Sequence, residues 1–361
     1  MNGAARHFSQ TYAEARGKFL DALGAHAVEA ARHVHPAARG RDGEDLAMDC
    51  ALLGPASAER LLILSSGTHG VEGFGGSGAQ VALLHDAGFA SRLSASGISL
   101  LLVHAVNPYG FSHWHRTNED NIDLNRNFVD HGKPHPPDGG YAELHPLLVP
   151  RHWPPSAYNY LTIAAYIVRR GMPALQQALS RGQYTFGDGL FYGGNAPSWS
   201  NRTLRAVLRS FAGRAKRVLW IDFHTGLGPY GHGEMIQAGR DDDAELARAR
   251  AVWGKDVTSI YKGTSTSARV EGLIAFAVYD ELPGVEYAGI GLEFGTRPML
   301  AVLQALRADN WLAMHPEAPD ALRAAIKRQV RNAFYCDADD WKAMLVGQAR
   351  KVSLAALDAL A

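Results

Sequence analysis

Four short runs of mostly apolar residues constrain the fold more than any other feature of this sequence. Each has the length of a β-strand, and the strongest of them is nearly continuous in leucine, isoleucine and valine. Strands that are apolar on both faces are typical of a parallel sheet covered by helices on both sides. The runs cover residues 60–66, 98–106, 217–223 and 288–294.

Segments with helical spacing of apolar residues lie between and after these runs, and one further strand is expected at residues 46–53. The predicted helices cover residues 8–36, 77–86, 156–180, 198–213, 242–254, 298–307, 317–334 and 338–348. Residues 130–157, rich in proline and histidine, are expected to be irregular. Because no repeat or long linker divides the chain, we predict one α/β domain over residues 1–361, with a mostly parallel mixed sheet flanked by helices on both faces.

Composition excludes several classes of function. Hydrophobic residues make up 47% of the 361 residues, which is enough for a full core, and 36 basic residues balance 36 acidic ones. A neutral chain shows no basic bias that would indicate nucleic acid or an anionic membrane, so neither partner is expected. Two cysteines cannot form a disulfide framework. The polar start lacks the apolar core of a signal peptide, and a cytoplasmic protein is therefore expected.

Ionisable residues lie where three of the predicted strands end. His69 and Glu72 follow the first run, His224 follows the third, and Glu293 lies near the end of the fourth. In open α/β sheets, ligands bind outside the carboxyl ends of the strands, so these side chains are expected to meet. Two histidines and one carboxylate suit a catalytic zinc ion, which keeps one position open.

Each of these histidines alone is more often a structural residue than a ligand, and only the combination points to a metal. His232 and Glu234 lie close to His224 in sequence and are alternative ligands, although a Gly-Pro turn precedes them. The sequence also contains a G-x-G-x-x-G pattern at residues 73–78, which is typical of dinucleotide binding. The acidic ribose partner is missing, so we expect these glycines to open a helix and make room at the site.

Two arginines lie within a stretch of eleven residues, in a loop rich in glycine and asparagine. Arg116 and Arg126 follow the second apolar run. The planar guanidinium group binds a carboxylate through two parallel hydrogen bonds, so the loop suits anion recognition. An equally simple explanation is a salt bridge between Arg126 and Asp123 that fixes the loop.

Five motifs in order, HGVE, NPYGF, DLNRNF, DFHTG and LEFGT, resemble the zinc carboxypeptidase superfamily. They span residues 69–295, roughly two-thirds of the chain. Residues 43–80 further resemble a bacterial branch of that superfamily known as DUF2817. The resemblance implies a zinc-exopeptidase-like fold and a metallohydrolase.

The resemblance also implies a role for each motif residue. One Zn²⁺ ion would be held by two histidines and a glutamate, namely His69, Glu72 and His224. Glu293 resembles the glutamate that takes a proton from water and gives it to the leaving nitrogen. Arg116 resembles the arginine that polarises the scissile carbonyl, and Asn125 and Arg126 resemble the pair that holds the free carboxylate of the substrate.

The substrate is left open between a peptide and an N-acyl amino acid, each with a free carboxylate. Amidohydrolases such as aspartoacylase and succinylglutamate desuccinylase share the same ligands and glutamate. A metal- or ligand-binding protein without turnover is a third possibility, although such a protein needs no Glu293. The mobile tyrosine of the superfamily has no secure counterpart, and Tyr261 is favoured over Tyr279 and Tyr287. The oligomeric state is not predicted.

Overall fold

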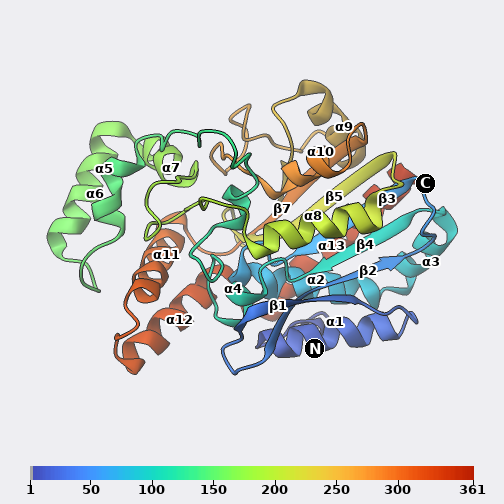
Figure 1. Ribbon diagram of the computed structural model, residues 1–361, viewed down its shortest axis with the longest axis horizontal. Helices are drawn as coiled ribbons and strands as arrows, with labels where there is room; N and C mark the ends of the chain where they lie inside the picture. The colour runs from blue at the N-terminus through green and yellow to red at the C-terminus, as the bar shows by residue number, and fades with distance from the viewer. Residues whose placement is uncertain (1–2) are drawn as a thin grey trace.

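A seven-stranded mixed β-sheet forms the centre of the molecule in the computed structural model, which describes residues 3–361 (Figure 1). The strand order is β1-β2-β4-β3-β5-β7-β6. The strands are β1 (Ala31–Arg39), β2 (Asp45–Leu53), β3 (Arg60–Ser66), β4 (Ser99–His104), β5 (Arg217–Gly226), β6 (Gly233–Gln237) and β7 (Glu286–Gly295). The four central strands run parallel and the edges are antiparallel, which confirms the predicted mixed sheet in one α/β domain.

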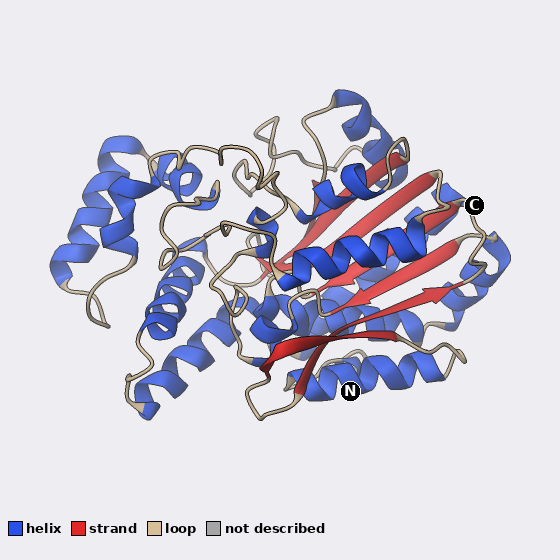
Figure 2. Ribbon diagram, viewed as in Figure 1, coloured by secondary structure: helices blue, strands red, loops and turns tan. Residues whose placement is uncertain are grey.

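Helices cover both faces of the sheet (Figure 2). One face packs against α1 (Tyr12–Gly24), α2 (Gly73–Leu84), α3 (Ala87–Ser96), α9 (Asp243–Trp253) and α13 (Asp339–Leu360). The other face packs against α8 (Trp199–Ala212) and α10 (Ala277–Glu281). Within β3, Leu62 and Leu64 enter the first core while Leu61 and Ile63 enter the second. Burial on both faces explains why the central strands read as continuous apolar runs.

Five further helices lie beyond the carboxyl ends of the parallel strands, at the left of Figure 1. They are α5 (Tyr141–Leu148), α6 (Ala157–Arg170), α7 (Met172–Ser180), α11 (Met299–Met314) and α12 (Asp320–Phe334). A third apolar cluster joins α5, α6, α7, α11 and α12. The short helix α4 (Pro108–Ser112) follows β4 on the same side. The strand ends are therefore enclosed by protein.

Three expectations about secondary structure were wrong. The helix predicted for residues 8–36 ends at Gly24, and residues 31–39 form the edge strand β1, in which Pro36 is tolerated because only one neighbour pairs with it. The strand β6 was missed because it is a short edge strand after a turn. Residues 130–157, expected to be irregular, contain α5.

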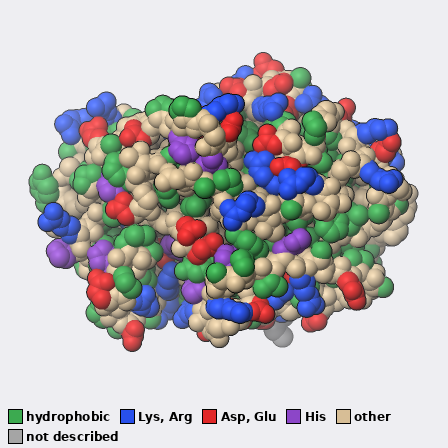
Figure 3. Space-filling view, in the orientation of Figure 1, with side chains coloured by type: hydrophobic (Ala, Val, Ile, Leu, Met, Phe, Trp, Pro, Cys, Tyr) green, Lys and Arg blue, Asp and Glu red, His purple; other side chains and the backbone are tan. Residues whose placement is uncertain are grey.

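The surface carries both signs of charge, interspersed over the face shown in Figure 3. Cys50 and Cys336 are both buried and unpaired. Across residues 3–361, the search for a helix long and apolar enough to cross a membrane found none. The cytoplasmic location stays a prediction.

Candidate active site

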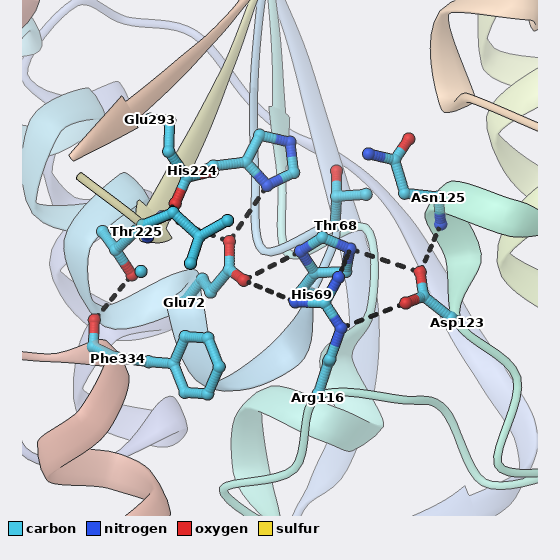
Figure 4. Close-up of polar contacts among 12 residues, drawn as sticks. Thr68, His69, Glu72, Arg116, Asp123, Asn125, His224, Thr225, Glu293 and Phe334 are labelled. Carbon is cyan, nitrogen blue, oxygen red and sulfur yellow. Dashed lines mark hydrogen bonds and ion pairs between the residues drawn. The ribbon is translucent and has the colours of Figure 1, made fainter. Parts of the chain in front are cut away.

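The two histidines and the glutamate predicted as metal ligands meet at the carboxyl ends of β3 and β5 (Figure 4). His69 follows β3, Glu72 ends the 3₁₀ turn Gly70–Glu72, and His224 lies within β5. One ligand atom from each residue lies within 4.8 Å of the other two, and all three residues are buried. This donor set fits a zinc ion with an open coordination position.

Close backbone contacts fix the turn that carries His69 and Glu72. The amide of Gly70 donates to the carbonyl of Arg116 at 3.1 Å, and the amide of Val71 donates to the carbonyl of His115 at 2.9 Å. A Cβ atom on Gly70 would lie 2.1 Å from the carbonyl carbon of Gly110. Only glycine permits this approach, so the HGVE turn and the Arg116 loop are held together as one unit.

Both histidine rings turn the same nitrogen toward Glu72. The Nδ1 atoms of His69 and His224 face Glu72, at 2.8 Å from Oε1 and 2.9 Å from Oε2 respectively. The opposite Nε2 atoms face buried aspartates, with Asp123 at 3.3 Å from His69 and Asp222 at 2.6 Å from His224. A metal-bound histidine usually donates its second ring N–H to a carboxylate, as the Nε2–H of His224 can to Asp222. The two Nδ1 atoms are thus the nitrogens that could share a metal ion with Glu72.

Asp222 is itself held by a set of buried donors. It accepts hydrogen bonds from Ser65 Oγ at 2.6 Å and from Thr68 Oγ1 at 2.9 Å. Trp220 Nε1 donates to Ser65 Oγ at 2.7 Å. Although burial alone would lower the pKa of His224, the charge of Asp222 and its hydrogen bond raise that pKa well above its ordinary value. Asp222 therefore orients the ring and supports its basicity.

Arg116 lies across the cluster between two carboxylates. Its Nη1 donates to Glu72 Oε1 at 3.1 Å and its Nε donates to Asp123 Oδ2 at 3.0 Å, while Nη2 lies 2.8 Å from His69 Nε2. Burial lowers the pKa of Arg116, but the charges of Asp123 and Glu72 outweigh it and raise that pKa. The charge of Arg116, followed by those of Arg126 and His69, likewise outweighs burial and holds the pKa of Asp123 well below its ordinary value.

Glu293 lies beside the cluster on β7. The parallel register pairs it with His224 on β5, and its Oε1 accepts a hydrogen bond from the Leu227 amide at 2.9 Å. It is half-buried, with its carboxylate facing the hollow described below. Burial, followed by the negative charge of Glu72, raises the pKa of Glu293 to about 8. A carboxyl group with such a pKa can both accept and release a proton near neutral pH.

The predicted carboxylate-binding pair lies on the 3₁₀ turn Leu124–Arg126. The Oδ1 atom of Asn125 accepts from the Ile274 amide at 2.9 Å. Arg126 donates Nε and Nη2 to the carbonyl of Ser180, at 2.9 and 2.5 Å, and Nη1 to its neighbour's carbonyl at 2.8 Å. Its Nη1 is 4.0 Å from Asp123 Oδ1, so the suggested salt bridge is present but long. Arginine has five N–H groups, and these three hydrogen bonds leave two for an anion.

A hollow of about 1360 Å³, including its part open to solvent, adjoins all these groups. Its polar lining includes the seven predicted site residues His69, Glu72, Arg116, Asn125, Arg126, His224 and Glu293. The remainder of its wall is mostly apolar. The structure thus brings these seven side chains together on one cavity.

A family model described as "Protein of unknown function (DUF2817)" matches residues 8–348. The chain belongs to the DUF2817 family. The predicted membership is therefore confirmed. A search of the curated proteins finds no match to this DUF2817 protein.

Solved structures similar to this DUF2817 protein are distant in sequence. One is thrombin activatable fibrinolysis inhibitor, at 14% identity over 99% of this chain and 79% of that chain, with a TM-score of 0.49. Carboxypeptidase A from Helicoverpa armigera is similar at 13% identity over 88% of this chain and 73% of that chain, with a TM-score of 0.44. Murein-tripeptide amidase from Escherichia coli O157 is similar at 17% identity over 78% of this chain and 91% of that chain, with a TM-score of 0.36. These identities and TM-scores do not assign an activity to this chain.

Two alternatives from the sequence lie outside the cluster in this DUF2817 protein. Glu234 on β6 accepts hydrogen bonds from Thr258 Oγ1 at 2.6 Å and from the Thr266 amide at 3.2 Å, which makes it a structural carboxylate. The favoured tyrosine, Tyr261, donates its hydroxyl to the Gly239 carbonyl at 2.7 Å and does not line the hollow.

The glycines of the G-x-G-x-x-G pattern serve helix packing. A Cβ atom on Gly75 would lie 2.6 Å from the Thr225 side chain. One on Gly76, which lies between two glycines of the pattern, would lie 2.7 Å from Ser66 Cβ. They let α2 approach β3 and β5, in line with the expectation that they make room.

Sequence reasoning missed the carboxylates behind the histidines. Asp222 precedes His224 by two residues on the same strand, and the period of two places both side chains on one face. That spacing was an available signal. Asp123 was considered only as a partner of Arg126, whereas it also faces His69 and Arg116.

Proposed function

We propose that this DUF2817 protein is a zinc-dependent hydrolase that cleaves an amide bond next to a free carboxylate. One observation carries the proposal: both Nδ1 atoms face Glu72, while each Nε2 atom faces a buried aspartate. Histidines that only stabilise a core have no need for two separate carboxylates behind them. The arrangement supports the assignment of both histidines as metal ligands.

His69, Glu72 and His224 would hold the zinc ion. Zinc, when bound, supplies Lewis acidity that polarises a carbonyl group and acidifies water. Asp222 keeps the proton of the His224 ring on Nε2, which leaves its Nδ1 lone pair free for the metal. Asp123 would do the same for His69 once the Arg116 guanidinium, which lies 2.8 Å from His69 Nε2 here, turns to the substrate.

Glu293 would carry the proton transfers. Its raised pKa allows the carboxylate to take a proton from water and to give it to the leaving amide nitrogen. The bond that breaks is the amide C–N bond, and the products are a carboxylic acid and an amine. The Leu227 amide holds one oxygen of Glu293 and leaves the other directed to the hollow.

Arg116, Asn125 and Arg126 would bind the substrate. Arg116 would donate to the oxygen of the scissile carbonyl, and Glu72, to which Arg116 donates here, would then serve the metal. A donor of this kind contributes about 3 kcal/mol. The two N–H groups of Arg126 that are not used by the protein would bind the free carboxylate beside Asn125.

The decisive experiment compares Glu293→Gln with wild type and with Glu234→Gln. Glu234 is the antiparallel register partner of Glu293, but it bonds to threonines and does not line the hollow. Zinc content and turnover of dipeptides and N-acetyl amino acids are measured on the same samples. We expect Glu293→Gln to keep its zinc and to lose about 10²–10⁴-fold in kcat, while Glu234→Gln stays near wild type. Near-normal turnover in Glu293→Gln would remove the general-base role, and absence of zinc in wild type would refute the proposal as a whole.

A further inference from the structure

The hollow extends away from the metal-ligand cluster between two helices, α7 and α11. Its wall there consists of aliphatic side chains from both helices, which we call the apolar trough. The trough comprises Met172, Leu175 and Leu179 on α7 and Val302, Leu303 and Leu306 on α11. Figure 1 shows both helices beyond the carboxyl ends of the parallel strands. The trough and the metal-ligand cluster therefore line the same hollow.

The trough offers little hydrogen bonding to a ligand. Its walls are helices, whose backbone donors and acceptors are bonded within the helix over most of their length. Among the lining residues of α7 and α11, only Gln176 and Ser180 are polar. The Nε2 atom of Gln176 donates to the Thr266 carbonyl at 2.7 Å, and the Ser180 carbonyl already accepts from Arg126.

Because the trough has few hydrogen-bonding groups, it favours a hydrocarbon chain over a peptide. Each amide of a peptide extended along the trough would lose water without a replacement hydrogen bond, which is unfavourable. A hydrocarbon chain loses no hydrogen bonds there, and every methylene that is buried is stabilising. Leu300, which is 53% exposed, also lines the hollow, so that its apolar character continues to the surface.

The α7 wall comes from the part of the chain that separates Glu72 from His224. Leu175 and Leu179 are buried against Val302 and Leu306 in one apolar cluster, which makes the base of the trough rigid. Met172 and Leu303 are half-buried and form its accessible walls.

We propose that the apolar trough binds the aliphatic acyl chain of an N-acyl amino acid. The acyl carbonyl lies at the metal-ligand cluster and the carboxylate of the amino acid lies at Asn125 and Arg126. This proposal rests on the proposed function. Hydrolysis breaks the amide C–N bond, adds the hydroxyl of water to the acyl carbon and its hydrogen to the nitrogen, and yields a fatty carboxylate and a free amino acid.

The first test is a series of substrates with one amino acid and a growing acyl chain. N-acetyl, N-butanoyl, N-octanoyl and N-dodecanoyl derivatives of the same amino acid are compared with peptides of matching length. Each methylene buried in the trough is expected to raise kcat/KM about fourfold until the trough is filled. Lengthening the peptide is expected to give no comparable gain. Values of kcat/KM that do not change with acyl length would overturn the proposal.

The second test changes the wall. Leu303→Gln introduces a polar group into the trough and is expected to reduce the gain per methylene to less than half. The matched control is Ala301→Gln, an exposed position on the same helix that does not line the hollow, for which the gain per methylene should be that of wild type. Equal gains in Leu303→Gln and wild type would place the acyl chain elsewhere.

A binding measurement separates this proposal from the proposed function. Calorimetry with octanoate, decanoate and dodecanoate needs no catalysis, and affinity is expected to rise with chain length in wild type and less in Leu303→Gln. If no amide is hydrolysed but this dependence is seen, the trough stands and the hydrolase proposal fails. If N-acetyl amino acids and dipeptides are hydrolysed but neither rate nor affinity responds to chain length, the trough proposal fails alone. If there is neither hydrolysis nor binding, both fail.

Discussion

The support that Asp222 gives to His224 leads to a quantitative prediction for zinc affinity. Replacing Asp222 with asparagine keeps the size of the side chain and an oxygen that accepts from Nε2 of His224. The change removes the negative charge that lies 2.6 Å from that nitrogen. If His224 is a ligand through Nδ1, its ability to bind zinc should fall, because the carboxylate makes the ring a stronger base.

The expected size of the effect follows from the surroundings of Asp222. Loss of a supporting carboxylate typically weakens metal binding 10–100-fold, which corresponds to about 1.4–2.8 kcal/mol. Asp222 is only 3% exposed, so solvent does not screen its charge. We therefore expect the loss of zinc affinity in Asp222→Asn to lie in the upper half of this range. Asp222→Ala also removes the hydrogen-bond acceptor and is expected to bind zinc more weakly still.

The assay is a competition between the protein and a chromophoric chelator for zinc at fixed pH. The control is Asp49→Asn, a buried aspartate on β2 whose carboxylate pairs with Arg16 at 2.6 Å and takes no part in the cluster. Circular dichroism and urea unfolding show whether each variant is folded. If folded Asp222→Asn binds zinc within twofold of wild type, or if Asp49→Asn is weakened equally, the reasoning about His224 is wrong.

Two further predictions concern stability and substrate binding. Burial lowers the pKa of His104 from 6.5 to about 4, so its contribution to stability is complete above pH 6.5 and is lost as the pH falls toward 4. At pH 5 the loss is about 2 kcal/mol. Urea unfolding at pH 7.5 and pH 5 should show that the free energy of unfolding falls less in His104→Gln than in wild type. Equal falls in the two proteins would contradict this role of His104. Amidating the carboxylate of the substrate should reduce kcat/KM of wild type roughly tenfold or more but that of Arg126→Ala only slightly. Equal reductions would make Arg126 a structural residue.

The centre of the fold could be predicted from the sequence, while its edges could not. Strands buried on both faces must be apolar throughout, so residues 60–66 and 217–223 were recognised with bounds close to those of β3 and β5. An edge strand has one free side and carries polar residues, and β1 therefore resembled the end of a helix. The short β6 depends on pairing with β7, which no local pattern reveals.

The candidate site shows a similar division. The ligand types were visible because the motifs place them at strand ends, where the topology forces them together. The supporting contacts depend on side chains from distant segments, as when His69 meets Asp123, and local spacing does not predict such contacts. The hydrogen bond from Arg126 to the Ser180 carbonyl could not be predicted either, because α7 reaches the site only through tertiary packing.

The charges enclosed at the site give an independent reason to expect a divalent cation. Four carboxylates meet there, and two guanidinium groups face them. With all four carboxylates ionised and the histidines neutral, two negative charges would be uncompensated, and without a metal the raised pKa values of His224 and Glu293 offset that excess. The carboxylates are Glu72, Asp123, Asp222 and Glu293, and the guanidinium groups are Arg116 and Arg126. Uncompensated charge in an enclosed site is costly, and a group that can take up a proton does so.

The raised pKa of Glu293 is that response, since burial and the charge of Glu72 both favour its neutral form. A cation with two positive charges, held by Glu72 and the two Nδ1 atoms, would balance the cluster and let Glu293 ionise. The same carboxylate would then be a base only when the metal is present, which links the two halves of the proposed chemistry through electrostatics alone.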